Sequence, residues 1–143
     1  MHFTTLFILK GEELENISLY EIEELFYERY CYGSSDYDKP HKPRYEWWCD
    51  WFKVGGRWCD ILVANKGIVG ERSWCNQEEE QEPNHFSIVE IKDLKEPINE
   101  DSIYAVATKS RIYQDGDEKY HSLIEQINSK QFDGVIALID CHD

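Results

Sequence analysis

The chain has 143 residues, with 15 lysines and arginines against 29 aspartates and glutamates, and its formal net charge is −14. Hydrophobic residues make up 41% and aromatic residues 14%, which is enough apolar surface for a core and excludes a disordered chain. The negative charge excludes direct binding to a nucleic-acid backbone or an anionic membrane surface, because each needs a basic face. This length predicts a single domain over residues 1–143.

The five cysteines are odd in number and widely spaced, which favours free thiols in a reducing cytoplasm. No apolar window approaches the ~18 residues of a membrane span, and the first ten residues lack the features of a signal peptide. No cysteine pair has zinc-site spacing, although Cys49, Cys59 and Cys75 could converge with His85 or His142. Buried thiols are the simpler interpretation, so we expect no metal and no other cofactor. The free thiols and the lack of a membrane span or signal peptide predict a cytoplasmic protein without a membrane partner.

The first predicted elements are a strand and a helix. Residues 3–9 are β-branched and aromatic, which is typical of a central strand. Ser18 and Glu21 then form the S-x-x-E capping box of a helix, and Ile17 and Ile22 occupy the hydrophobic-staple positions around it. A polar loop is expected at residues 33–46, which contain two prolines.

Gly55-Gly56 lies between two β-rich runs and predicts a two-residue hairpin turn. In that register one face of the hairpin is apolar and belongs to the core: Phe52, Val54, Cys59, Ile61 and Val63. The other face is both aromatic and charged: Trp51, Lys53, Trp58 and Asp60.

The second half of the chain predicts strands at 86–91 and 103–108, a second helix, and a strand buried on both faces at 134–139. The helix is indicated by apolar residues at helical spacing, with Asp117 or Asp115 as its cap: Tyr120, Leu123, Ile124 and Ile127. The order β-α-β-β-β-β-α-β predicts an α+β fold, a two-layer sandwich with two helices on one face of a mixed sheet. The first and last strands are the most apolar and are expected to be central and adjacent.

Two segments carry a resemblance to a known group. The run Trp48-x-x-Trp51-Phe52-x-Val54-Gly55-Gly56-Arg57-Trp58 and the terminal Ile139-Asp140-Cys141-His142 resemble small uncharacterised phage and prophage proteins. Members of that group carry a W-D-W-[YF]-x-[IV]-G-G-R-W segment and a closing D-C-H. The resemblance covers about 15 positions and implies a phage or mobile-element origin, but no mechanism.

Three sets of residues are candidates for binding. The first set could anchor a partner, because tryptophan and arginine are enriched at binding hot spots. It consists of Trp51, Lys53, Arg57, Trp58 and Asp60. The glycine amides and Arg57 could instead cradle an anion, although a plain turn is the simpler interpretation. Glu78, Glu79 and Glu80 belong to the acidic surface, which serves either solubility or electrostatic steering.

Asp140, Cys141 and His142 are the third set and could line a pocket at the end of the last strand. Adjacent strand residues point to opposite faces, so Cys141 and His142 are not expected to pair. His142 would then need Asp50, Asp60 or His2 as a partner, and His2 can approach it only if the terminal strands are antiparallel.

These features lead to two hypotheses. The first is a non-enzymatic phage-type binding protein that inhibits a nucleic-acid-targeting host defence system, as an anti-CRISPR or a nucleic-acid mimic does. Its partner would be a host protein in the bacterial cytoplasm. The alternative is a small-molecule or nucleotide-binding protein, a sponge or small hydrolase, with a pocket formed by the Gly-Gly-Arg-Trp turn and the C-terminal Asp-Cys-His.

Overall fold

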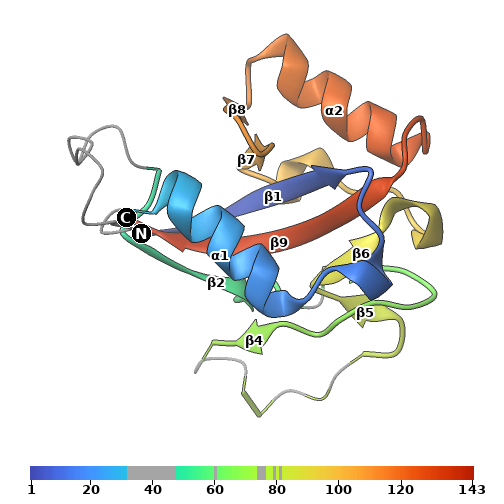
Figure 1. Cartoon of the computed structure of the whole chain (residues 1–143), viewed down its shortest axis with the longest axis horizontal. Coiled ribbons are helices and arrows are strands. Elements are labelled where there is room, and N and C mark those ends of the chain that lie inside the picture. The colour runs from blue at the N-terminus through green and yellow to red at the C-terminus, as the bar shows by residue number, and fades with distance from the viewer. Residues whose placement is uncertain (32–47, 60, 74–76, 79, 81) are drawn as a thin grey trace.

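The two ends of the chain form the centre of the sheet (Figure 1). In the computed structural model, which describes residues 1–31, 48–59, 61–73, 77–78, 80 and 82–143, β1 (His2–Lys10) pairs antiparallel with β9 (Gly134–His142) along its whole length. Both strands are almost continuously buried, as expected from their apolar sequences. The predicted central and adjacent terminal strands are therefore confirmed.

In the described part of the chain, five further strands belong to this mixed sheet, in the order β4-β2-β9-β1-β7-β8, with β6 also paired to β9. They are β2 (Trp51–Gly56), β4 (Glu71–Arg72), β6 (Ile88–Glu90), β7 (Ala105–Ala107) and β8 (Ile112–Gln114). The β1–β7 and β2–β4 pairs are parallel and the others antiparallel. A separate two-stranded sheet joins β3 (Leu62–Val63) to β5 (His85–Phe86).

Two α-helices of the described residues pack on the sheet, so the predicted α+β class is confirmed. Helix α1 (Leu19–Tyr30) begins after Ser18, whose Oγ accepts a hydrogen bond from the Glu21 amide at 3.1 Å, and Ile17 and Ile22 are both buried beside it. Helix α2 (Glu118–Asn128) follows Asp117 and buries its four predicted apolar side chains. No helix in the described part of the chain is long and apolar enough to cross a membrane.

The expectation that both helices lie on one face of the sheet is wrong. Phe7 and Leu9 of β1 pack in one core cluster with Phe26 of α1, whereas Leu6 and Ile8 pack in a second cluster with the apolar side of α2. Because successive strand residues point to opposite faces, the two helices cover opposite faces. The sequence of β1 and β9 already contained the reason, since strands buried on both faces need a covering layer on each side.

The predicted Gly55-Gly56 hairpin is also wrong. Among the described residues, strand β2 does not pair with the segment that follows it but pairs antiparallel with β9, opposite Ile139 to His142. The two glycines do have positive φ values, +91° and +56°, as expected. The hydrogen-bonded turn lies one residue later than expected, because the Trp58 amide donates to the Gly55 carbonyl at 3.0 Å. Strand β9 in turn extends past the predicted 134–139 through Asp140, Cys141 and His142, because β1 and β2 supply partners on both of its edges.

Candidate functional site

Pairing of β2 with β9 brings together the two segments that carried the resemblance. Trp51 lies opposite His142 and Lys53 opposite Asp140, and on the other edge of β9 His2 lies opposite His142. Trp51, His142 and His2 therefore form one row across three neighbouring strands, on the same face of the sheet. This row lies at the end of the sheet where both chain termini are found (Figure 1).

Asp140 organises this part of the molecule from a fully buried position. Its Oδ1 lies 2.8 Å from His2 Nδ1, and its Oδ2 accepts a hydrogen bond of 2.9 Å from the backbone N–H of Arg57. A Cβ on Gly56 would lie 2.3 Å from Oδ2, so only glycine permits this approach. The Gly-Gly-Arg segment thus binds a carboxylate of the protein itself, which removes the Arg57 amide from any cradle for an external anion.

The row of rings is held by a second carboxylate. His142 Nδ1 lies 2.8 Å from Asp50 Oδ1, one of the three partners expected for it. The Trp51 ring, 41% exposed, stacks on His142 at a centroid distance of 5.1 Å, and the His2 ring meets both rings edge-on. Trp51 exposes this cluster to solvent, while Asp140 orients His2 and Asp50 orients His142.

Cys141 lies on the opposite face from His142, as strand alternation predicts, and is fully buried near Thr5. The two residues therefore do not form a nucleophile and base. Cys31 and Cys49, at a parallel bridge close by, have raised pKa values, mainly because of hydrogen bonding to a neighbouring thiol in each case. Such thiols are protonated and unreactive at neutral pH, so this group belongs to the core.

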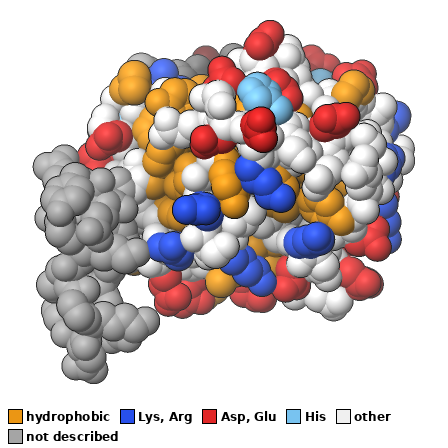
Figure 2. Space-filling view, turned by 90° about the horizontal axis from the view of Figure 1, so that it is seen from above, with side chains coloured by type: hydrophobic (Ala, Val, Ile, Leu, Met, Phe, Trp, Pro, Cys, Tyr) orange, Lys and Arg blue, Asp and Glu red, His pale blue; other side chains and the backbone are white. Residues whose placement is uncertain are grey.

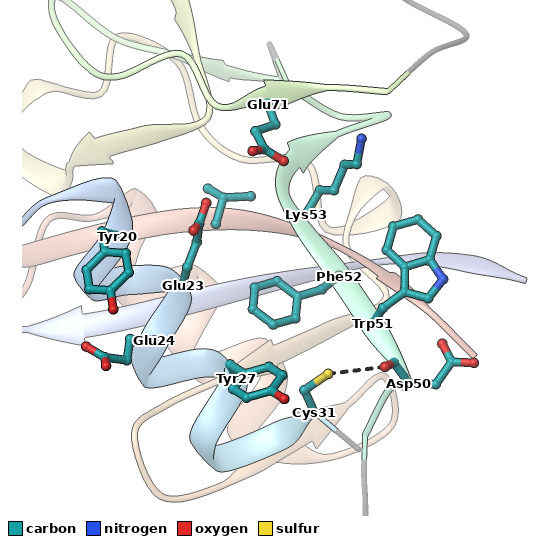
Figure 3. Close-up of a pocket in the computed structure, with 11 residues that line it drawn as sticks. Tyr20, Glu23, Glu24, Tyr27, Cys31, Asp50, Trp51, Phe52, Lys53 and Glu71 are labelled. Atoms are coloured by element: carbon teal, nitrogen blue, oxygen red, sulfur yellow. Dashed lines mark hydrogen bonds between the residues drawn. The ribbon is translucent and has the colours of Figure 1, made fainter. Parts of the chain in front are cut away.

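A groove of about 620 Å³ runs between α1 and β2 (Figure 3). Its lining includes three aromatic side chains that are exposed, Tyr20, Tyr27 and Trp51, and Phe52, which points toward the helix. The charged groups of the lining are four carboxylates and one ammonium group: Glu23, Glu24, Asp50, Glu71 and Lys53. The groove is therefore both aromatic and predominantly negative.

Two of these carboxylates act on each other across the groove. Burial raises the pKa of Glu23, and the negative charge of Glu71 raises it further. Figure 3 shows the two side chains approaching from α1 and from β4. A cation placed between them would relieve this repulsion.

A second cavity, of about 550 Å³, lies on the α2 side of the sheet and is lined by His2, Trp58, Tyr104 and several carboxylates. Trp58 is half-buried there and packs against the core cluster beneath α2. Trp51 and Trp58 thus both lie near His2, but Trp51 also borders the α1 groove whereas Trp58 does not. Trp48 belongs to the core, where its Nε1 donates to Thr5 Oγ1.

The remaining predicted residues are dispersed. Arg57, Glu78 and Glu80 are exposed and line none of the cavities described above, while Asp60 and Glu79 lie outside the described residues. The acidic surface does not include Glu90, which is buried and accepts the backbone N–H of Leu14. The Glu90 carboxylate therefore stabilises the fold and does not contribute to a binding surface.

The surface charge is not uniform. Figure 2 shows one face on which acidic side chains lie toward the upper and lower margins, basic ones lie between them, and hydrophobic side chains are exposed near the basic ones. The net charge of −14 therefore does not describe every face, and a binding surface has to be located by its own residues.

Sequence reasoning missed the groove residues of α1, Tyr20, Glu23 and Tyr27, and Glu71 of β4. Tyr20 and Tyr27 are aromatic residues seven positions apart, outside the buried stripe of α1. Large aromatic side chains on the outer face of an amphipathic helix were a usable signal for a binding surface.

Comparison with protein-family models, with curated proteins and with solved structures finds no match. Among the described residues, no group of three or more His, Cys, Asp or Glu side chains is arranged to hold a metal ion. The function therefore has to be argued from the site itself.

Proposed function

We propose that this protein is a non-enzymatic binding protein that receives a basic segment of a partner protein in the groove between α1 and β2. The observation that carries the proposal is the combination of exposed aromatic rings and excess carboxylates in one groove (Figure 3). A guanidinium or ammonium group gains cation–π energy over such rings and charge-assisted hydrogen bonds to such carboxylates.

The strand beside the groove adds a second kind of contact. Among the described strands, β2 pairs with β9 on one edge and on the other with β4 only at Gly55 and Gly56. An unpaired strand edge presents backbone groups that an extended peptide can join. Aromatic anchors beside such an edge provide the specificity that backbone pairing lacks.

The resemblance to phage proteins suggests where the partner is found. A host protein that binds nucleic acid carries a basic channel, and an acidic protein is attracted to it by the same field that attracts phosphate. The proposed biological role is therefore inhibition of a nucleic-acid-targeting defence system in the cytoplasm of a bacterial host. The nucleotide-pocket alternative is less favoured, because Asp140 already uses the Arg57 amide and carboxylates dominate the groove.

The test compares three variants in capture of host proteins at low salt and in binding of an oligoarginine peptide. Glu71→Lys and Trp51→Ala alter the groove, whereas Glu125→Lys makes the same charge change on the exposed side of α2. We expect both groove variants to lose binding and Glu125→Lys to retain it. Equal losses in the two lysine variants would show that net charge alone is responsible and would refute the groove.

A thermal-shift screen with nucleotides tests the alternative. A ligand at a hundredfold excess over its Kd stabilises the folded protein by about 2.7 kcal/mol, which such a screen detects. A nucleotide hit abolished by Trp58→Ala, without any peptide binding, would replace the proposed function with the alternative.

A further inference from the structure

His2 and His142 form a pair that the proposed groove does not use. They lie directly opposite each other on the antiparallel strands β1 and β9, with their ring centroids 5.3 Å apart. Side chains at opposite positions of an antiparallel pair project from the same face with their Cβ atoms ~4.5–5.5 Å apart. Two imidazoles are thus brought into edge-on contact by the two central strands of the sheet.

Each ring is oriented by its own carboxylate. His2 Nδ1 lies 2.8 Å from Asp140 Oδ1, and His142 Nδ1 lies 2.8 Å from Asp50 Oδ1. Neither Nε2 forms a hydrogen bond to another side chain or backbone group of the described chain, so this nitrogen remains available in both rings. An imidazole with one nitrogen on a carboxylate and the other free is the arrangement typical of metal-ligating histidines.

Charge and access also favour a cation here. The two carboxylates bring two negative charges to two imidazoles that are neutral when unprotonated. The His2 and His142 side chains are 19% and 32% exposed, so an ion can reach them from solvent. The stacked Trp51 ring forms a wall on one side of the pair.

We propose that His2 and His142 bind one divalent transition-metal ion, with Zn²⁺, Ni²⁺ or Cu²⁺ as the class that imidazole prefers. The protein supplies two ligands through the Nε2 atoms, and water completes the coordination. Asp50 and Asp140 act as positioning residues that fix the ring orientation. This inference does not depend on the proposed groove.

The test is calorimetric titration of the full chain with ZnCl₂ and NiCl₂ near neutral pH. We expect one equivalent to bind, with a loss of more than about tenfold in affinity for His2→Ala and for His142→Ala and a loss of about 10–100-fold for Asp50→Asn. His121→Ala is the matched control, since His121 is also paired with a carboxylate, Glu100, but lies on α2. The metal affinity of the His121→Ala variant is expected to equal that of the wild type.

Quenching of tryptophan fluorescence by Cu²⁺ gives a second readout, because Trp51 stacks on His142. The saturable part of the quenching should fall in Trp51→Phe, which keeps both histidines, and should disappear in the His2→Ala/His142→Ala double variant. Thermal unfolding without metal confirms that each variant is folded. Absence of saturable binding, or one-to-one binding that survives in the His2→Ala/His142→Ala double variant, would overturn the proposal.

Discussion

Gly56→Ala tests the contact on which the candidate site is built. At φ +56° an alanine costs ~1–2 kcal/mol in backbone conformation. The new Cβ would also lie 2.3 Å from Asp140 Oδ2 and 2.4 Å from Asp140 Cβ. Asp140 is fully buried in the central strand β9 and has no room to retreat, so overpacking adds ~1–3 kcal/mol.

The same substitution strains a charged hydrogen bond. Displacing the Asp140 carboxylate weakens its contact with the Arg57 amide, a type of bond worth ~1.5–3 kcal/mol. Part of this cost overlaps with overpacking, so we expect a total loss of about 3–6 kcal/mol from a folding free energy that is typically ~5–15 kcal/mol.

Gly11→Ala is the matched control, because Gly11 has φ +81° but no atom within 4 Å of the added Cβ. It should lose only the backbone part, ~1–2 kcal/mol. Urea unfolding followed by circular dichroism should place the midpoint of Gly56→Ala on the order of 1–2 M below that of Gly11→Ala. Equal midpoints would refute the close approach of Gly56 to Asp140.

Two further predictions concern charge and capping. The backbone N–H of Leu14 and then Lys92 lower the pKa of Glu90 below its ordinary value near 4.5, so its charge stabilises the fold above that pH and this contribution is lost as the pH falls through the lowered pKa. Wild type should therefore unfold at higher urea than Glu90→Gln at pH 7, with the difference shrinking below about pH 4.5, and a pH-independent difference would contradict this. Ser18→Ala removes the acceptor of the Glu21 amide at the start of α1 and should cost ~0.5–2 kcal/mol in the same assay, whereas Ser18→Gly should recover most of it.

The sequence by itself determined the helices and the central strands. The capping box at Ser18, the apolar stripe of α2 and the apolar terminal strands depend on local spacing and hydrophobicity, and local rules predicted them correctly. It also showed that Cys141 and His142 point apart, because alternation along a strand is local. The positive φ values of Gly55 and Gly56 were likewise predictable from the local sequence, because glycine is the residue that adopts them readily.

Only the tertiary structure decided which strands pair and which faces the helices cover. The turn at Gly55-Gly56 is compatible with a local hairpin, but pairing with β9 lets Asp140 accept the Arg57 amide and lets Trp51 stack on His142. These contacts join residues more than 80 positions apart in the chain, so no spacing rule reports them. The groove has the same origin. Its carboxylates from α1, from Asp50 just before β2 and from β4 become neighbours only after the sheet has formed, because burial in the core fixes strand order, and strand order places the surface side chains.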